Sequence, residues 1–208
     1  MIGNALPGYE ALDSVSLREF FYSLEKQKIK PGGVQLDGTN GRDGGHTGTI
    51  YDIRSGWLLG RITATGKYVP LKRTRVNMTG ATATDIVVDN SYAFAVGDVI
   101  SIGSDTGLTI SAVDYTTHTL TIASTTVADN EAVVAEDGSQ TCRGILWDFQ
   151  RLRNYLNTAA ADKTGTLLTG GVINTVGLLG DWDAVLASGL TNHFLGDFEF
   201  WTNGVQVG

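Results

Sequence analysis

The chain has 208 residues, 42% of them hydrophobic, which is enough for one large domain or two small ones with a packed core. Its formal net charge of −7 would repel a phosphate backbone, so we expect no direct contact with nucleic acid. No run of about 18 apolar residues is present, and the sequence therefore predicts no helix across a membrane.

The N-terminal residues contain Gly, Asn and Pro without periodicity, and we expect 1–16 to form an extended arm. They lack a basic segment followed by an apolar run, so we expect no signal peptide and synthesis in the cytoplasm. Ser16 and Glu19 then have the spacing of a helix-capping box. Apolar residues follow at helical spacing: Leu17, Phe20, Phe21 and Leu24. This pattern predicts an amphipathic helix over 17–28.

A long polar loop at 37–45 contains Asp37, Asn40 and Asp43, which invite comparison with a calcium site. Their spacing differs from that of an EF-hand loop, in which ligands alternate and a Glu completes the set. Aspartate and asparagine side chains that bond to nearby main-chain N–H groups explain the composition without an ion. We therefore expect Asx-turns here and no metal.

Glycine-bounded strands are expected next, over 49–53, 57–63 and 67–69. The stretch from Gly60 to Lys67 is not a phosphate-binding loop. Five residues separate Gly60 from Gly66 instead of four, and Tyr68 replaces the Ser or Thr that would hold magnesium. The sequence thus predicts no nucleotide cofactor.

The composition changes near Leu71, and the following residues are rich in Thr and Val. No Lys or Arg lies between Arg75 and Arg143. Short strands are expected over 85–88, 98–102, 108–113, 119–123 and 132–135, with a hairpin loop at 114–118. Five strands at this spacing predict that 71–137 forms a small inserted β-barrel or β-sandwich.

The remainder, 138–208, returns to longer apolar strands. We expect strands at 142–146 and 198–201, and a pair of strands at 165–168 and 171–174. Asp181 is a candidate N-cap for a short helix over 182–188.

No residues have the pattern of a catalytic centre, and we expect no enzymatic activity and no cofactor. The single cysteine, Cys142, lies in a predicted strand and is expected to be a buried apolar residue. The three histidines, His46, His118 and His193, lack neighbours at metal-ligand spacing. Four tryptophans could line a sugar site, but their apolar neighbours favour a core or a subunit interface: Trp57, Trp147, Trp182 and Trp201.

Three short segments carry a resemblance to a known family: 60–70, with its Thr-Gly-Lys turn, 142–146, and Gly170-Gly171-Val172. Together they resemble the head-decoration proteins of tailed phages, the group typified by the decoration protein of phage lambda. The resemblance covers about 47–70 and 138–208. The helix at 17–28 and the insert at 71–137 go beyond the smallest members of that group.

The resemblance implies a mainly β fold with short helices (α+β), in which 17–70 and 138–208 form one discontinuous β-tulip-like domain. It implies a homotrimer on the outer surface of the virion, at threefold positions, that binds the major capsid protein and cements the expanded shell. Residues of the arm would then contact the capsid: Met1, Ile2, Gly3, Asn4, Ala5, Leu6 and Pro7. Four aromatic residues would contribute to the trimer interface or the core: Trp57, Tyr68, Trp182 and Trp201.

Two other classes remain open on the sequence. The inserted β domain would also suit a phage tail or neck structural protein. If the insert projects outward, the tryptophans would suit a surface module that binds a receptor or glycan.

Overall fold

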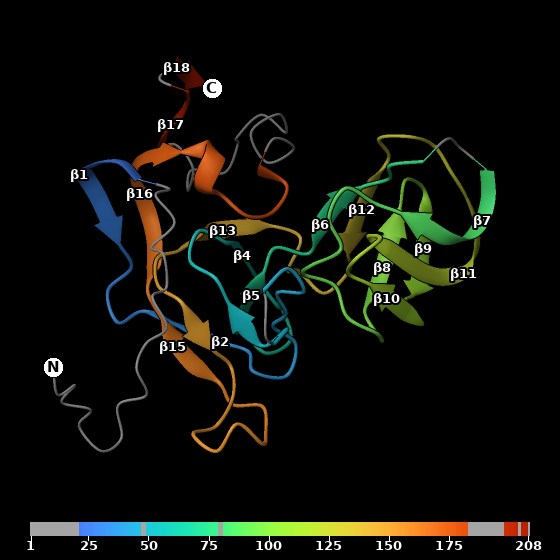
Figure 1. Ribbon diagram of the computed structural model, residues 1–208, viewed down its shortest axis with the longest axis horizontal. Coiled ribbons are helices and arrows are strands. Elements are labelled where there is room, and N and C mark those ends of the chain that lie inside the picture. Colours follow the sequence, from blue (N-terminus) through green and yellow to red (C-terminus); the bar gives the residue numbers. More distant parts are fainter. Residues whose placement is uncertain (1–20, 47–48, 79–80, 183–197, 204, 208) are drawn as a thin grey trace, which may run out of the picture.

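The computed structural model describes residues 21–46, 49–78, 81–182, 198–203 and 205–207. The chain is mainly β, and its strands fall into a large sheet, two smaller sheets and one short strand pair (Figure 1). A single turn of 3-10 helix, η1 (Thr175–Gly177), follows one of the strands in the described part.

The large sheet has nine strands, of which eight follow the order β15-β2-β5-β4-β13-β16-β17-β18, while β1 pairs with β16. In chain order these strands are β1 (Phe21–Ile29), β2 (Val34–Leu36), β4 (Leu58–Arg61), β5 (Tyr68–Pro70), β13 (Cys142–Leu146), β15 (Lys163–Gly165), β16 (Leu167–Asn174), β17 (Phe198–Thr202) and β18 (Val205–Val207). A separate pair consists of β3 (Asp52–Ile53) and β14 (Gln150–Arg151).

The predicted helix over 17–28 is wrong where the structure describes it, because Phe21–Ile29 forms strand β1. The strand lies antiparallel to β16, with Ile29 opposite Leu168 and Phe21 opposite Ile173. An isolated helix of about 12 residues is marginal in water. Pairing with the free edge of a long strand satisfies main-chain groups and adds tertiary contacts, and Phe, Tyr and Ile favour strands.

The predicted strand pair at 165–168 and 171–174 is one continuous strand over most of its length, β16. Gly171 has a φ of +148°, and the register between β1 and β16 shifts repeatedly along the same stretch. Glycine allows such an irregularity inside a strand because it has no Cβ. Here the adjacent glycines therefore accommodate irregular pairing and do not end the strand.

Most other predicted strands are confirmed, several of them with shifted ends. The segment 142–146 is β13, 57–63 contains β4, 67–69 overlaps β5, and 198–201 lies within β17. The strand expected at 49–53 is shorter, since only β3 forms. The arm residues 1–16 and positions 183–188 of the predicted helix lie outside the described residues.

All five strands expected between 85 and 135 are present, although the third is divided in two. Together with β6, they form two sheets. The first has three strands: β10 (Ala112–Asp114), β11 (Thr119–Val127) and β7 (Ala81–Val87). The second has four: β6 (Arg73–Arg75), β12 (Ala132–Ala135), β8 (Val99–Ile102) and β9 (Asp105–Thr109). Both sheets are open, so the barrel that the sequence allowed is wrong.

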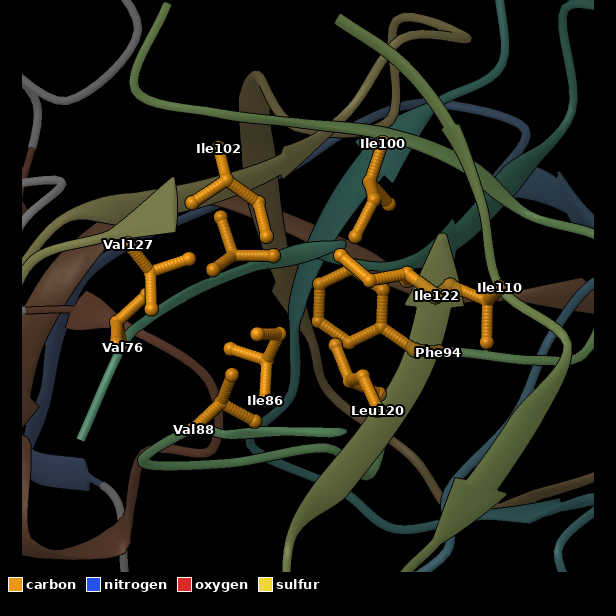
Figure 2. Close-up of a cluster of buried hydrophobic side chains, with 11 residues drawn as sticks. Val76, Ile86, Val88, Phe94, Ile100, Ile102, Ile110, Leu120, Ile122 and Val127 are labelled. Carbon is orange, nitrogen blue, oxygen red and sulfur yellow. The ribbon is translucent and has the colours of Figure 1, made fainter. Parts of the chain in front are cut away.

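The two small sheets share one hydrophobic core, shown in Figure 2. Phe94 lies among aliphatic side chains from both sheets, with Ile86 and Leu120 from one and Ile100 from the other. All four side chains are at most 1% exposed. Two other buried clusters underlie the large sheet, and Leu71 and Ala93 of the segment 71–137 belong to them.

The segment enters and leaves the large sheet beside the same strand, β4. Pro70 of β5 pairs with Leu59 on one side of β4, and Cys142 of β13 pairs with Gly60 on the other. Since neighbouring strands lie about 4.8 Å apart, the two connections are about 10 Å apart. Leu71 still packs in a core of the large sheet.

Candidate functional site

The aromatic residues predicted for the trimer or core occupy different environments. Trp57 is fully buried and Tyr68 is 8% exposed, and both belong to the same core cluster. Trp182 packs against another cluster, and Trp201 is half-buried on β17. Trp57 cannot therefore form part of a sugar-binding platform on the folded chain. The predicted arm, from Met1 to Pro7, lies outside the described residues.

The polar loop at 37–45 forms the predicted Asx-turns. The Asp37 carboxylate accepts hydrogen bonds from the main-chain N–H groups of Thr39 at 2.8 Å and Asn40 at 2.9 Å. Both Asp43 oxygens are bound by the Arg54 guanidinium, at 2.6 and 2.7 Å, in a buried bidentate pair. Across the described ranges, no three His, Cys, Asp or Glu side chains are grouped to hold a metal.

Ser91 and His118 lie close together without forming a reactive pair. The Ser91 hydroxyl is buried and donates to the main-chain carbonyl of Asp114 at 3.3 Å, and His118 Nδ1 lies at the same distance from the hydroxyl. The His118 ring also contacts Tyr92 edge-on. These contacts fasten the hairpin loop at 115–118 to the segment that contains Ser91, so their role is structural.

Cys142 is buried on β13, as predicted. Burial raises the pKa of its thiol to about 12, against the weaker opposite effect of a hydrogen bond to Gly144. Because the thiolate is the nucleophilic form of cysteine, this thiol is unreactive at neutral pH.

A cluster of cationic and aromatic side chains is the most distinctive polar feature of the described surface. The guanidinium carbon of Arg153 lies 3.5 Å from the centre of the Tyr51 ring, and that of Arg42 lies 4.5 Å from it. Tyr51 and both arginines are half-buried. We call these three residues the arginine–tyrosine cluster.

Nearby carboxylates do not neutralise this cluster. Asp43 is bound to Arg54, and Asp52 lies 3.3 Å from Arg151. Of the carboxylates that the structure describes, none forms an ion pair with Arg42 or Arg153, although Arg42 Nη1 donates to the Gly41 carbonyl at 2.7 Å. Two guanidinium groups beside one ring, without a counter-charge, form a surface suited to bind an anion.

A loop with its own hydrogen bonds, residues 154–159, follows Arg153 of the cluster. A β-bridge from Arg153 to Ala160 closes its base, and the Asn154 side chain accepts from the main-chain N–H of Thr158 at 2.9 Å. Inside the loop, Tyr155 is 92% exposed and Leu156 is 60% exposed. The loop lies between β14 and β15 and projects past the end of the large sheet (Figure 1).

This site was not predicted from the sequence, because the three members of the cluster come from distant positions: 42, 51 and 153. One local signal was available. Arg151, Arg153 and Tyr155 alternate along the chain, and Asn154 and Asn157 are residues that favour tight turns.

Charge is unevenly distributed along the chain. The stretch 76–142 contains nine Asp and Glu residues and no Lys or Arg, while the rest has thirteen acidic and fifteen basic residues. Within the described part, only Asp98 of those nine pairs with a cation, which is Lys72. Others are held by neutral donors. The pKa of Asp114, for example, is lowered by main-chain hydrogen bonds from Thr117 and Thr116.

No family model, curated protein or solved structure matches this chain. In the part of the chain with described coordinates, no helix is long and apolar enough to cross a membrane.

Proposed function

We propose that this protein decorates the outer surface of the expanded head of a tailed phage, where it binds the major capsid protein as a homotrimer and stabilises the shell. One observation carries the proposal. The segments on which the family resemblance rests, 60–70, 142–146 and Gly170 to Val172, contribute to the neighbouring strands β5, β4, β13 and β16 of one sheet. These segments are separate in sequence but lie in one sheet, and this supports the proposal.

The physical logic of such a protein is mass action. A packed genome pushes outward on a thin shell, and a trimer that bridges several capsid subunits adds interface where they would separate. A protein that binds the expanded shell more tightly than the unexpanded shell stabilises the expanded form by the difference between the two binding free energies. The chemistry of the described residues suits this structural role, since Cys142 is buried and the loop carboxylates Asp37 and Asp43 are occupied.

The arm, residues 1–16, would pair with strands of the capsid protein by strand addition. It leads into β1, which pairs with β16 at one edge. The segment 71–137 would project away from the shell, because both its connections lie beside β4 and most of its buried side chains form one cluster between the two smaller sheets.

Light scattering followed by co-sedimentation tests this function. We expect a trimer of about 66 kDa, three times the 22.1 kDa chain, that sediments with expanded, undecorated heads. Unexpanded heads are the matched control and should bind less protein. A variant that lacks residues 2–7 should keep the trimer and lose affinity for heads. No binding to heads in any state would refute the proposal, and recovery in tail fractions would favour a tail or neck component.

A further inference from the structure

We propose that the arginine–tyrosine cluster of one copy binds the acidic segment, residues 76–142, of a second copy, and that this contact closes the trimer. The inference rests on the proposed function, because it assigns residues to the self-association which that function requires. It starts from the charge distribution: the acidic segment carries a formal −9, and the rest of the chain a formal +2.

The geometry of the arginine–tyrosine cluster suits a carboxylate partner. Arg42 and Arg153 are both positioned over Tyr51, and Arg42 is also held by the Gly41 carbonyl. A guanidinium that stacks on a ring keeps its N–H edges available, and these edges match a carboxylate in a two-point geometry. Stacking also reduces the side-chain entropy that would be lost on binding.

The acidic segment of the same chain does not supply this partner. It approaches the cluster through Tyr115, a neutral side chain, whose pKa is raised by burial and lowered more weakly by the charge on Arg42. Six carboxylates of the segment are exposed and have no ion pair in the described part of the chain: Asp85, Asp89, Asp105, Asp114, Asp129 and Glu136. The segment therefore presents negative charge outward while the cluster remains positive.

A cyclic trimer joins two different patches, so that each subunit gives one and receives the other. This chain has a positive cluster and an acidic segment, and a contact between the cluster of one copy and the segment of the next would close a ring. Arginine and tyrosine are also the residues that most often dominate binding energy at protein interfaces. The exposed Tyr155 and Leu156, beside Arg153, add apolar area to the same contact.

Sedimentation velocity over a range of concentrations and salt tests the contact with the full chain. For the wild-type protein, we expect the dissociation constant of the trimer to rise about 10-fold between 50 and 500 mM NaCl, because the contact joins opposite charges. The double variant Arg42→Glu/Arg153→Glu should weaken association by about 100-fold, which corresponds to two lost charge pairs at about tenfold each.

Matched variants separate charge at the cluster from total charge and from folding. Arg143→Glu/Lys163→Glu makes the same change of net charge elsewhere on the large sheet, and association should stay within about threefold of wild type. Arg42→Lys/Arg153→Lys keeps the charge, loses the planar stack, and should give an intermediate result. Replacing Asp85, Asp89, Asp105 and Asp129 by Asn should also weaken association. Circular dichroism identifies any variant that fails to fold.

Three results would overturn the assignment: a wild-type chain that stays monomeric at high concentration, association that is independent of salt, or an Arg42→Glu/Arg153→Glu protein that associates like wild type. If that variant still forms trimers but no longer binds heads, the cluster contacts the shell and not a second copy. Binding of the wild-type protein to heads is scored separately, so failure of the decoration function is distinguishable from failure of this contact.

Discussion

The buried ion pair between Lys72 and Asp98 gives a quantitative prediction. Lys72 is the first residue beyond Leu71, and its side chain is 1% exposed. Its Nζ lies 2.5 Å from Asp98 Oδ1, while Asp98 Oδ2 accepts from the main-chain N–H of Ala95 at 2.8 Å. The main-chain carbonyl of Lys72 also accepts from Ala135 N–H. The pair thus holds the connection between β5 and β6 against the turn that precedes β8.

We expect Lys72→Met to lower the free energy of unfolding by about 3–5 kcal/mol, because it leaves the largely buried Asp98 carboxylate without its cation. For a chain of this length, that loss corresponds to a fall in Tm of about 6–20 °C. The double variant Lys72→Met/Asp98→Asn removes both charges, and the amide oxygen of the new side chain at position 98 can still accept from the main-chain N–H of Ala95. The double variant should recover most of the loss, to within about 1 kcal/mol of wild type.

Urea unfolding measured by two probes provides the assay. All four tryptophans lie outside 71–137, so fluorescence reports on the large sheet, whereas circular dichroism reports on every sheet. Two results would refute the reasoning about a buried, coupled pair. In the first, Lys72→Met lowers the free energy of unfolding by less than about 1 kcal/mol. In the second, the loss in the double variant equals the sum of the losses in the two single variants.

Three further predictions concern the large sheet. Gly60→Ala should cost about 3 kcal/mol in urea unfolding, since its Cβ would lie 1.7 Å from the main-chain oxygen of Ser139; a cost below about 1 kcal/mol would contradict this packing. Cys142 should not react with a thiol reagent at pH 8 until urea unfolds the chain, and rapid labelling of the folded protein would show that it is not buried. The pKa of Asp162 is lowered, first by its hydrogen bond from Lys67, so the stability it contributes should be present above pH 3.8 and disappear as the pH falls below that value. Lys67→Met should flatten this part of the stability profile, measured between pH 2.5 and 5, and an unchanged profile would exclude the pair as its cause.

Sequence patterns predicted the strands whose local signals agree with their surroundings. Strand β13 has the predicted bounds, since Cys142 pairs with β4 on one side while Ile145 and Leu146 pair with β16 on the other. The Asx-turn at Asp37 was also predictable, since it depends on residues within three positions. Local information was sufficient in both cases.

Prediction failed where distant partners decide the structure. The spacing around Phe21 predicted a helix, but this segment forms a strand because it pairs with β16, about 150 residues further along the chain. The arginine–tyrosine cluster was invisible for the same reason, because Arg42 and Tyr51 meet Arg153 only in the folded chain. The pairing of β1 and the meeting of Arg42, Tyr51 and Arg153 both depend on residues far outside a window of ten or fifteen residues.

The position of the two connections beside β4 has a practical consequence. Since Pro70 and Cys142 flank one strand and are about 10 Å apart, a foreign domain whose own ends are similarly close could be grafted there without changing the strand order. Leu71 would have to be kept, because it fills a core of the large sheet. The large sheet would then serve as a carrier, and the grafted domain would be displayed in place of the natural segment.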